Sequence, residues 1–172
     1  ICWEAEGGMW LLIKSAVIEG LDRHATFLIA LPNKEKLGPR AWAFWTRSGD
    51  QAWIGRRHTN FPDGSVCAFS PLEGVWLEGG RLEELVDLYS VWALRHLFLE
   101  QFKRWPGAQH TNSRLYRMIE FQPDELCSCP HGLRYADSCH KSDLASFVAN
   151  PAAFKRELEN ATGGYTLNDR SP

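Results

Sequence analysis

The sequence has no long apolar run and almost no excess charge. None of its hydrophobic stretches approaches the ~20 residues that a membrane-spanning helix needs. The formal net charge is −2 over 172 residues, which gives no general electrostatic attraction to nucleic acid or to an anionic membrane. We therefore expect neither nucleic acid nor a membrane among the partners of this chain.

Cysteine is scarce over most of the chain, and the number of cysteines is odd. There are five cysteines, and three of them lie close together near the C-terminal end. An odd and clustered set is unlike the framework of a disulfide-stabilised secreted domain. We therefore expect a reducing compartment, and the cytoplasm is the predicted location.

The hydrophobic pattern changes from strand-like to helical along the chain. Short apolar runs separated by Gly and Pro predict an antiparallel meander over residues 10–20, 26–31, 41–46 and 52–54. Apolar residues at helical spacing then predict helices over residues 81–105, 114–120, 143–148 and 151–160, the third of them capped by Ser142. The predicted fold class is α+β, with a small sheet followed by helices.

Cys67 is the first candidate for chemistry. It follows the turn signal Asp63-Gly64, so it is expected on irregular backbone near the surface, where a nucleophilic thiol must lie. Asn60 lies upstream and could donate its amide to a developing oxyanion, while His58 could order the loop. Alternative interpretations remain open, because a cysteine is often a small buried hydrophobe and an Asn in a turn is often only a turn former.

This segment resembles the catalytic segment of ubiquitin-conjugating enzymes. That family has His-Pro-Asn, a glycine turn, the active-site cysteine and a later Trp, with a proline-punctuated loop upstream. The corresponding residues here are His58, Asn60, Gly64, Cys67 and Trp76, with Leu31-Pro32 and Gly38-Pro39 upstream. Thr59 replaces the family's Pro, and the gap from Asn to Cys is one residue shorter, which indicates a distant and bacterial relative.

The resemblance implies an enzyme that carries an acyl group as a thioester on Cys67. Residues 1–122 would form the catalytic domain of this ubiquitin-conjugating-like (UBC-like) fold, with Asn60 and His58 supporting Cys67. The acyl donor would be a ubiquitin-like protein or a cGAS-like nucleotidyltransferase, supplied by a separate activating enzyme, in an anti-phage (CBASS-type) operon. Two alternatives are a non-catalytic adaptor of the same fold and a cysteine hydrolase that pairs Cys67 with His110 or His96.

A second candidate site lies near the C-terminal end. Cys127, Cys129, Cys139 and His140 form the pattern C-x-C-x9-C-H within 14 residues, a compact donor set for a tetrahedral Zn2+. The pattern resembles the SEC-C type of zinc motif. It predicts a structural zinc that stabilises a helical extension over residues 123–172. The alternatives are free thiols, or a disulfide between Cys129 and Cys139. His131 is a competitor of His140 for the fourth position.

Overall fold

The computed structural model describes residues 1–33, 38–55, 57–60, 63–69, 76, 80–109, 111 and 113–162. These residues form two compact units. The first unit runs from Ile1 to His96 and the second begins at Leu97. The division between the two units falls inside a long helix. The sequence predicts a different division, between a catalytic domain and a zinc-binding segment, after residue 122. That functional boundary stays a prediction.

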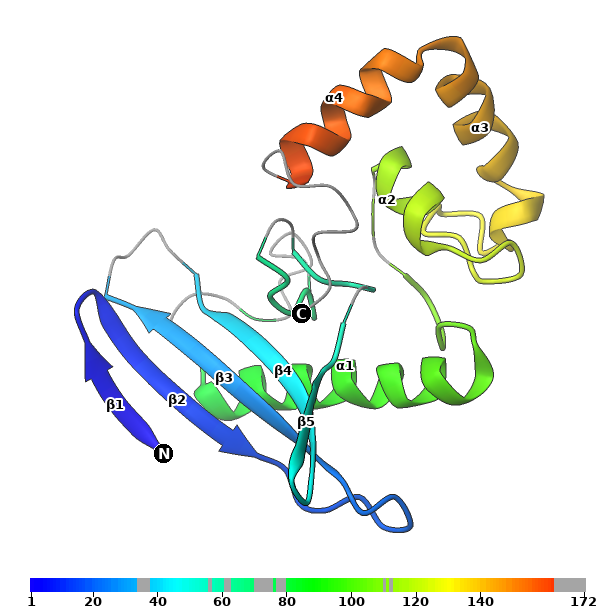
Figure 1. Ribbon diagram of the computed structural model, residues 1–172. Helices are drawn as coiled ribbons and strands as arrows, with labels where there is room; N and C mark the ends of the chain where they lie inside the picture. The colour runs from blue at the N-terminus through cyan, green and yellow to red at the C-terminus, as the bar shows by residue number, and fades with distance from the viewer. Residues whose placement is uncertain are drawn as a thin grey trace. The chain divides into compact units, whose positions relative to one another are not determined.

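The first unit contains a five-stranded antiparallel sheet in the order β1-β2-β3-β4-β5 (Figure 1). Neighbours in the sheet are neighbours in the sequence, so each connection is a hairpin. The strands are β1 (Cys2–Ala5), β2 (Gly8–Lys14), β3 (His24–Pro32), β4 (Arg40–Arg47) and β5 (Asp50–Trp53). The predicted α+β class, with a meander sheet followed by helices, is confirmed.

The core of the sheet is built from large side chains opposite small ones. Alternate residues of β3 and β4 are buried on one face, as expected for a sheet covered on that side. Across the register each large buried side chain faces an alanine, which leaves room for interdigitation without voids. The pairs are Ala25–Trp45, Phe27–Ala43 and Ile29–Ala41.

Helix α1 (Leu82–Phe102) supplies the cover for this face. Its buried residues recur at helical spacing along one stripe. The ring of Tyr89 packs on that of Phe27 in β3, with centroids 6.1 Å apart, and Figure 1 shows the helix crossing the strands. The buried residues of the stripe are Leu85, Tyr89, Trp92, Ala93 and His96. No helix of the described residues is long and apolar enough to cross a membrane.

Two predicted boundaries in this part of the chain were wrong. β2 ends at Lys14 and not at residue 20, because the hydroxyl of Ser15 accepts from the N–H of Ala25 and the chain then turns. α1 ends at Phe102 and not at residue 105, because Lys103 has a φ of 60°, a left-handed conformation that stops a helix.

The second unit contains short helices around a narrow hairpin. They are α2 (Arg114–Glu120), the 3-10 helix η2 (Tyr135–Asp137), α3 (His140–Ala149) and α4 (Pro151–Thr162). α2 has its predicted bounds, and α4 begins at Pro151 as predicted. α3 begins three residues earlier than predicted, because Cys139 and not Ser142 occupies the N-cap position. The hydroxyl of Ser142 instead donates to the carbonyl of Cys139 within the first turn.

Candidate active site and metal centre

Cys67 lies on a loop that is tied to the sheet through its backbone. An isolated antiparallel bridge pairs Thr59 with Val66, and the N–H of Val66 donates to the carbonyl of Ala41 in β4 at 2.7 Å. The N–H of Cys67 donates to the carbonyl of His58 at 2.9 Å. The Cys67 side chain itself is partly exposed. The loop therefore holds the backbone of Cys67 in place, with the residue at intermediate exposure.

The carbonyl of His58 receives a second hydrogen bond, from the first unit's helix. The indole Nε1 of Trp92 donates to it at 2.8 Å. His58 has a φ of 50°, an uncommon backbone conformation for a non-glycine residue, and this turn directs its carbonyl toward both donors. Trp92 thus connects α1 to the backbone of Cys67. Trp92 was not among the candidate site residues, although its place in the apolar stripe of the helix marked it as a buried residue.

The side chain of Asn60 faces the loop that carries Cys67. Its Nδ2 donates to the hydroxyl of Ser65 at 3.2 Å and to the carbonyl of Val66 at 3.1 Å. Its backbone N–H donates to the carbonyl of Ser65 at 2.7 Å. In this arrangement the amide braces the loop, and its predicted role as an oxyanion donor stays a prediction. Ser65, which is fully buried, was not singled out from the sequence, and no sequence signal marks it.

Asp63 anchors the opposite side of the same loop. Its carboxylate accepts from the N–H of Ser65 at 2.9 Å and forms an ion pair with Arg40. Burial opposes its ionisation, but the hydrogen bonds from Ser65 and the charge of Arg40 together hold the pKa of Asp63 below its ordinary value. The indole of Trp42 donates to the Asp63 carbonyl at 3.0 Å. The turn is therefore fixed at both ends, while its charges are largely balanced.

The two histidines considered for a hydrolase differ in what the structure shows. His110 lies outside the described residues. His96 is buried, with its ring 4.0 Å from that of Trp92 between centroids and its Nδ1 3.2 Å from the Trp92 carbonyl oxygen. Burial lowers the pKa of His96 to about 4, and the charge of Arg57 adds to this. Such an imidazole is a weak acceptor for a thiol proton.

The second candidate site brings three of its four predicted residues together. The Sγ atoms of Cys127, Cys129 and Cys139 all lie within 4.8 Å of one another. A tetrahedral zinc with Zn–S bonds of about 2.3 Å separates its sulfurs by about 3.8 Å, so a small closure would seat an ion. These three cysteines could therefore hold a metal ion.

A narrow hairpin positions these sulfurs. The N–H of Cys127 donates to the carbonyl of Leu133 at 2.8 Å, and Leu126 pairs with Arg134. Gly132 closes the turn between the two arms. Its φ is 62°, a backbone conformation in which a residue with a side chain would be strained. The hairpin carries the first two cysteines, and the start of α3 delivers Cys139.

The thiols of the cluster influence one another. Burial opposes ionisation of Cys127, but hydrogen bonds from the Ser138 side chain and from the backbone and side chain of Cys129 hold the pKa of Cys127 below its ordinary value. Burial and the neighbouring Cys127 and Cys129 raise the pKa of Cys139 to about 11. Ionisation of one thiol therefore opposes ionisation of the next. A bound cation would compensate the negative charges and so remove this penalty.

The fourth predicted ligand, His140, lies outside the three-sulfur group. It is the first residue of α3, and its ring packs edge-on against Tyr135 with centroids 5.1 Å apart. His131, the competitor, is exposed in the hairpin turn. Both remain predictions for the fourth position.

A buried ion pair between α2 and α3 lies beside the cluster. The carboxylate of Asp143 is fully buried and accepts two hydrogen bonds from Arg117, at 2.7 and 2.8 Å, and one from the Tyr135 hydroxyl at 3.1 Å. This bidentate pair fixes α2 against α3. Tyr135 also packs on Phe121 and on Cys127, so the network reaches the sulfurs.

No protein-family model, curated protein or solved structure matches the chain.

Proposed function

We propose that the chain is a ubiquitin-conjugating-like acyl carrier that uses Cys67, in the first unit, as its thioester cysteine. The observation that supports this most is the placement of Cys67. It is a partly exposed thiol on an irregular loop whose backbone is held by the His58 carbonyl and whose neighbour, Val66, is held by Asn60. A buried structural cysteine needs neither the exposure nor the bracing.

The proposed reaction exchanges one thioester for another. The Cys67 thiolate attacks the carbonyl carbon of a thioester carried on an activating enzyme, a new thioester forms on Cys67, and the thiolate of the activating enzyme leaves. The acyl group belongs to the C-terminus of a ubiquitin-like protein or of a cGAS-like nucleotidyltransferase. An acceptor amine then attacks the Cys67 thioester, an amide forms, Cys67 leaves as thiolate and the amine proton passes to solvent. Asn60 and His58 keep the loop in place through both steps.

The anti-phage setting, the cytoplasmic location and the UBC-like fold belong to the same proposal. The sequence resemblance supports them, together with the order of a meander sheet, a braced cysteine loop and a covering helix. The catalytic part is assigned to residues 1–122.

Thioester formation is directly measurable. The chain is incubated with an activating enzyme and its acyl donor, and the products are separated without reducing agent. An adduct that thiol releases, and that Cys67→Ala abolishes while Cys2→Ala retains it, supports the carrier. Hydrolysis of small esters or peptides without a stable adduct contradicts the proposal, as does partner binding in which Cys67 takes no part.

For the second unit we propose a structural zinc held by Cys127, Cys129, Cys139 and His140. The soft thiolate donors and their mutual distances support zinc. The expected result is one zinc per chain in freshly purified protein. His140→Ala is expected to weaken zinc binding strongly while His131→Ala leaves it unchanged, and the reverse result would transfer the fourth position to His131.

A further inference from the structure

The three cysteines of the cluster differ in exposure. Cys129 and Cys139 are residues of intermediate exposure, whereas Cys127 is buried, with 5% of its surface accessible. Buried thiols are inert toward reagents in solution, and thiols near the surface react with them. A small oxidant is therefore expected to reach the cluster through Cys129 and Cys139.

The sulfurs of the cluster are also close enough to bond to one another. Their separations are at most 4.8 Å, and an S–S bond is about 2 Å long, so a pair closes by less than about 3 Å. The backbone on each side is held by hydrogen bonds that do not involve sulfur. The N–H of Cys127 donates to the carbonyl of Leu133 at 2.8 Å, and the N–H of Asp143 donates to that of Cys139 at 2.9 Å. Side-chain rotation can therefore bring two sulfurs together while the hairpin and α3 stay in place.

Chain connectivity and packing select Cys129 and Cys139 as the pair. Only one residue separates Cys127 from Cys129, and a disulfide between them would close a very small, strained ring. Cys127 also packs in the apolar cluster with Phe121 and Tyr135, which shields it. Cys129 and Cys139 instead come from different segments, the hairpin and the N-cap of α3.

We propose that Cys129 and Cys139 form a reversible disulfide in the presence of a peroxide, and that this disulfide expels the metal from the cluster. One thiolate attacks the O–O bond, becomes a sulfenic acid and releases hydroxide. The other thiolate attacks that sulfur, the S–S bond forms and a second hydroxide leaves. The two sulfurs lose two electrons, the peroxide gains them, and two protons from solvent complete two water molecules. In a reducing compartment such a disulfide is transient.

Release of the metal follows from the loss of donors. A sulfur in a disulfide has no negative charge, so Cys127 and one histidine remain, which are too few donors for a tetrahedral zinc. The release rests on the proposed zinc site, whereas the disulfide also forms in a metal-free chain.

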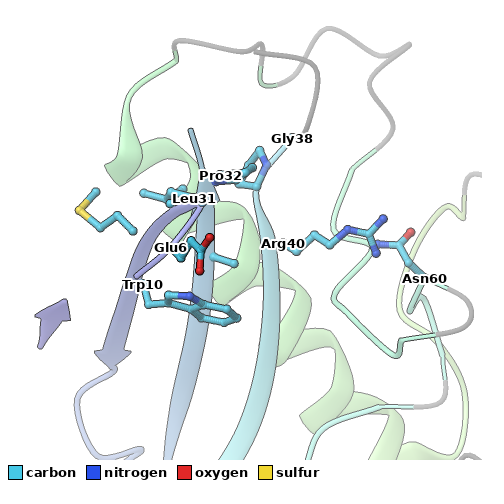
Figure 2. Close-up of a pocket in the computed structure, with 12 residues that line it drawn as sticks. Glu6, Trp10, Leu31, Pro32, Gly38, Arg40 and Asn60 are labelled. Atoms are coloured by element: carbon cyan, nitrogen blue, oxygen red, sulfur yellow. The ribbon is translucent and has the colours of Figure 1, made fainter. Parts of the chain in front are cut away.

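The first unit has no equivalent pair among its described cysteines. Three strand spacings of about 4.8 Å separate Cys2 in β1 from Ala41 in β4, and Cys67 lies beyond β4 on the loop that bonds to Ala41. This distance is too long for a disulfide. The cavity of about 590 Å³ at one end of the sheet offers an oxidant no thiol either, since none of the described residues that line it is a cysteine (Figure 2).

The test uses the full chain with Cys2→Ser and Cys67→Ser, so that the three clustered cysteines are the only thiols. Freshly purified protein receives one equivalent of hydrogen peroxide, and zinc release is followed with a chromogenic chelator. The remaining thiols are then alkylated without reduction, and the protein is digested with trypsin for mass spectrometry.

The digest locates the disulfide. Cleavage after Arg134 leaves Cys139 on peptide 135–141 and the other two cysteines on peptide 118–134. A disulfide to Cys139 joins the two peptides, and fragmentation at Ser128 shows which cysteine of the longer peptide is alkylated.

We expect joined peptides with the alkyl group on Cys127, and one zinc ion released for each disulfide. Dithiothreitol is expected to restore the thiols, after which added zinc binds again. Cys127→Ser in the same background is the matched variant, and it is expected to form the same joined peptides. Peptides joined through Cys127, zinc retained after the peptides are joined, or sulfinic acid without joined peptides each overturns the proposal.

The outcomes also distinguish this proposal from the zinc site itself. Zinc that stays bound through peroxide treatment, with all three thiols intact, overturns the disulfide and leaves the zinc site supported. Joined peptides from protein that contains no zinc as purified support the disulfide and contradict the zinc site.

Discussion

The two units are stabilised in different ways. The first buries apolar side chains between a sheet and one helix face, and the interior of β3 and β4 is almost fully shielded from solvent. The second has a small apolar cluster of Phe121, Cys127 and Tyr135, and its other buried groups include charged ones. Several large apolar side chains of the second unit remain exposed, among them Leu126, Leu133, Leu144, Phe147 and Val148.

This difference indicates which unit a bound metal ion would stabilise. Hydrophobic burial stabilises a fold in proportion to apolar area, and a unit of short helices that leaves several large apolar side chains exposed gains less of it. Two of its buried carboxylates, Glu125 and Asp143, are satisfied by hydrogen bonds, which give specificity of packing more than net stability. The cysteine cluster is therefore the natural source of additional stability in the second unit alone.

Removal of a bound metal is expected to have the largest effect, and to affect the two units differently. A structural zinc contributes on the order of 10 kcal/mol to the folding of the segment that holds it. Chelation, or the double change Cys127→Ser and Cys139→Ser, is expected to expose the amides of α2, α3 and α4 to hydrogen exchange. The amides of β3 and β4 are expected to keep their protection, because their core contains no cysteine.

Cys2→Ser provides the control for this experiment, since that thiol is exposed on β1 in the first unit. It is expected to change neither the metal content nor the exchange of any helix. Full protection of α3 after chelation would contradict the comparison, because the second unit would then be stable without its cluster.

The sequence predicted the first unit's order of elements well, because period-2 alternation and turn residues are local signals. β3, β4 and β5 fall close to their predicted ranges. β1 was missed, since a four-residue strand with every side chain exposed has no alternation of burial to reveal it. The end of β2 was misplaced because Val17 and Ile18 continue the β-branched composition, while the turn depends on a hydrogen bond from Ala25, ten residues later.

The candidate sites were predictable to different degrees. The spacing of three cysteines predicted their cluster, because the donors lie within a short hairpin and its exit. The bracing of Cys67 was not predictable in full, since Trp92 reaches His58 from 34 residues away. Such a contact depends on how α1 packs on the sheet.

Acid is expected to weaken the first unit through His96. The pKa of this buried imidazole is about 4 in the fold and 6.5 in an unfolded chain. Above pH 6.5 both states are neutral and His96 contributes no pH dependence. Between pH 6.5 and pH 4 only the unfolded state takes up the proton, so the free energy of unfolding falls by about 3 kcal/mol. Hydrogen exchange of β3 amides against pH measures this loss.

His96→Gln isolates this contribution, because glutamine fills a similar space and does not titrate. The variant is expected to be less stable at pH 7 yet to lose about 3 kcal/mol less than the native protein between pH 6.5 and pH 4. Parallel stability curves for the two proteins would show that His96 is not the acid-sensitive group of the first unit.

The smallest expected effect concerns one hydrogen bond within the first unit, from Trp92 to the carbonyl of His58. Trp92→Phe keeps an aromatic ring in the core but removes the indole donor to the His58 carbonyl, which costs about 1 kcal/mol. Because that carbonyl also accepts from the N–H of Cys67, the Cys67 amide is expected to exchange about fivefold faster. Tyr89→Phe, on the same helix face but packed on Phe27, is the matched control and is expected to leave this rate unchanged. Equal acceleration in both variants would mean that α1 supports the sheet as a whole and does not position Cys67.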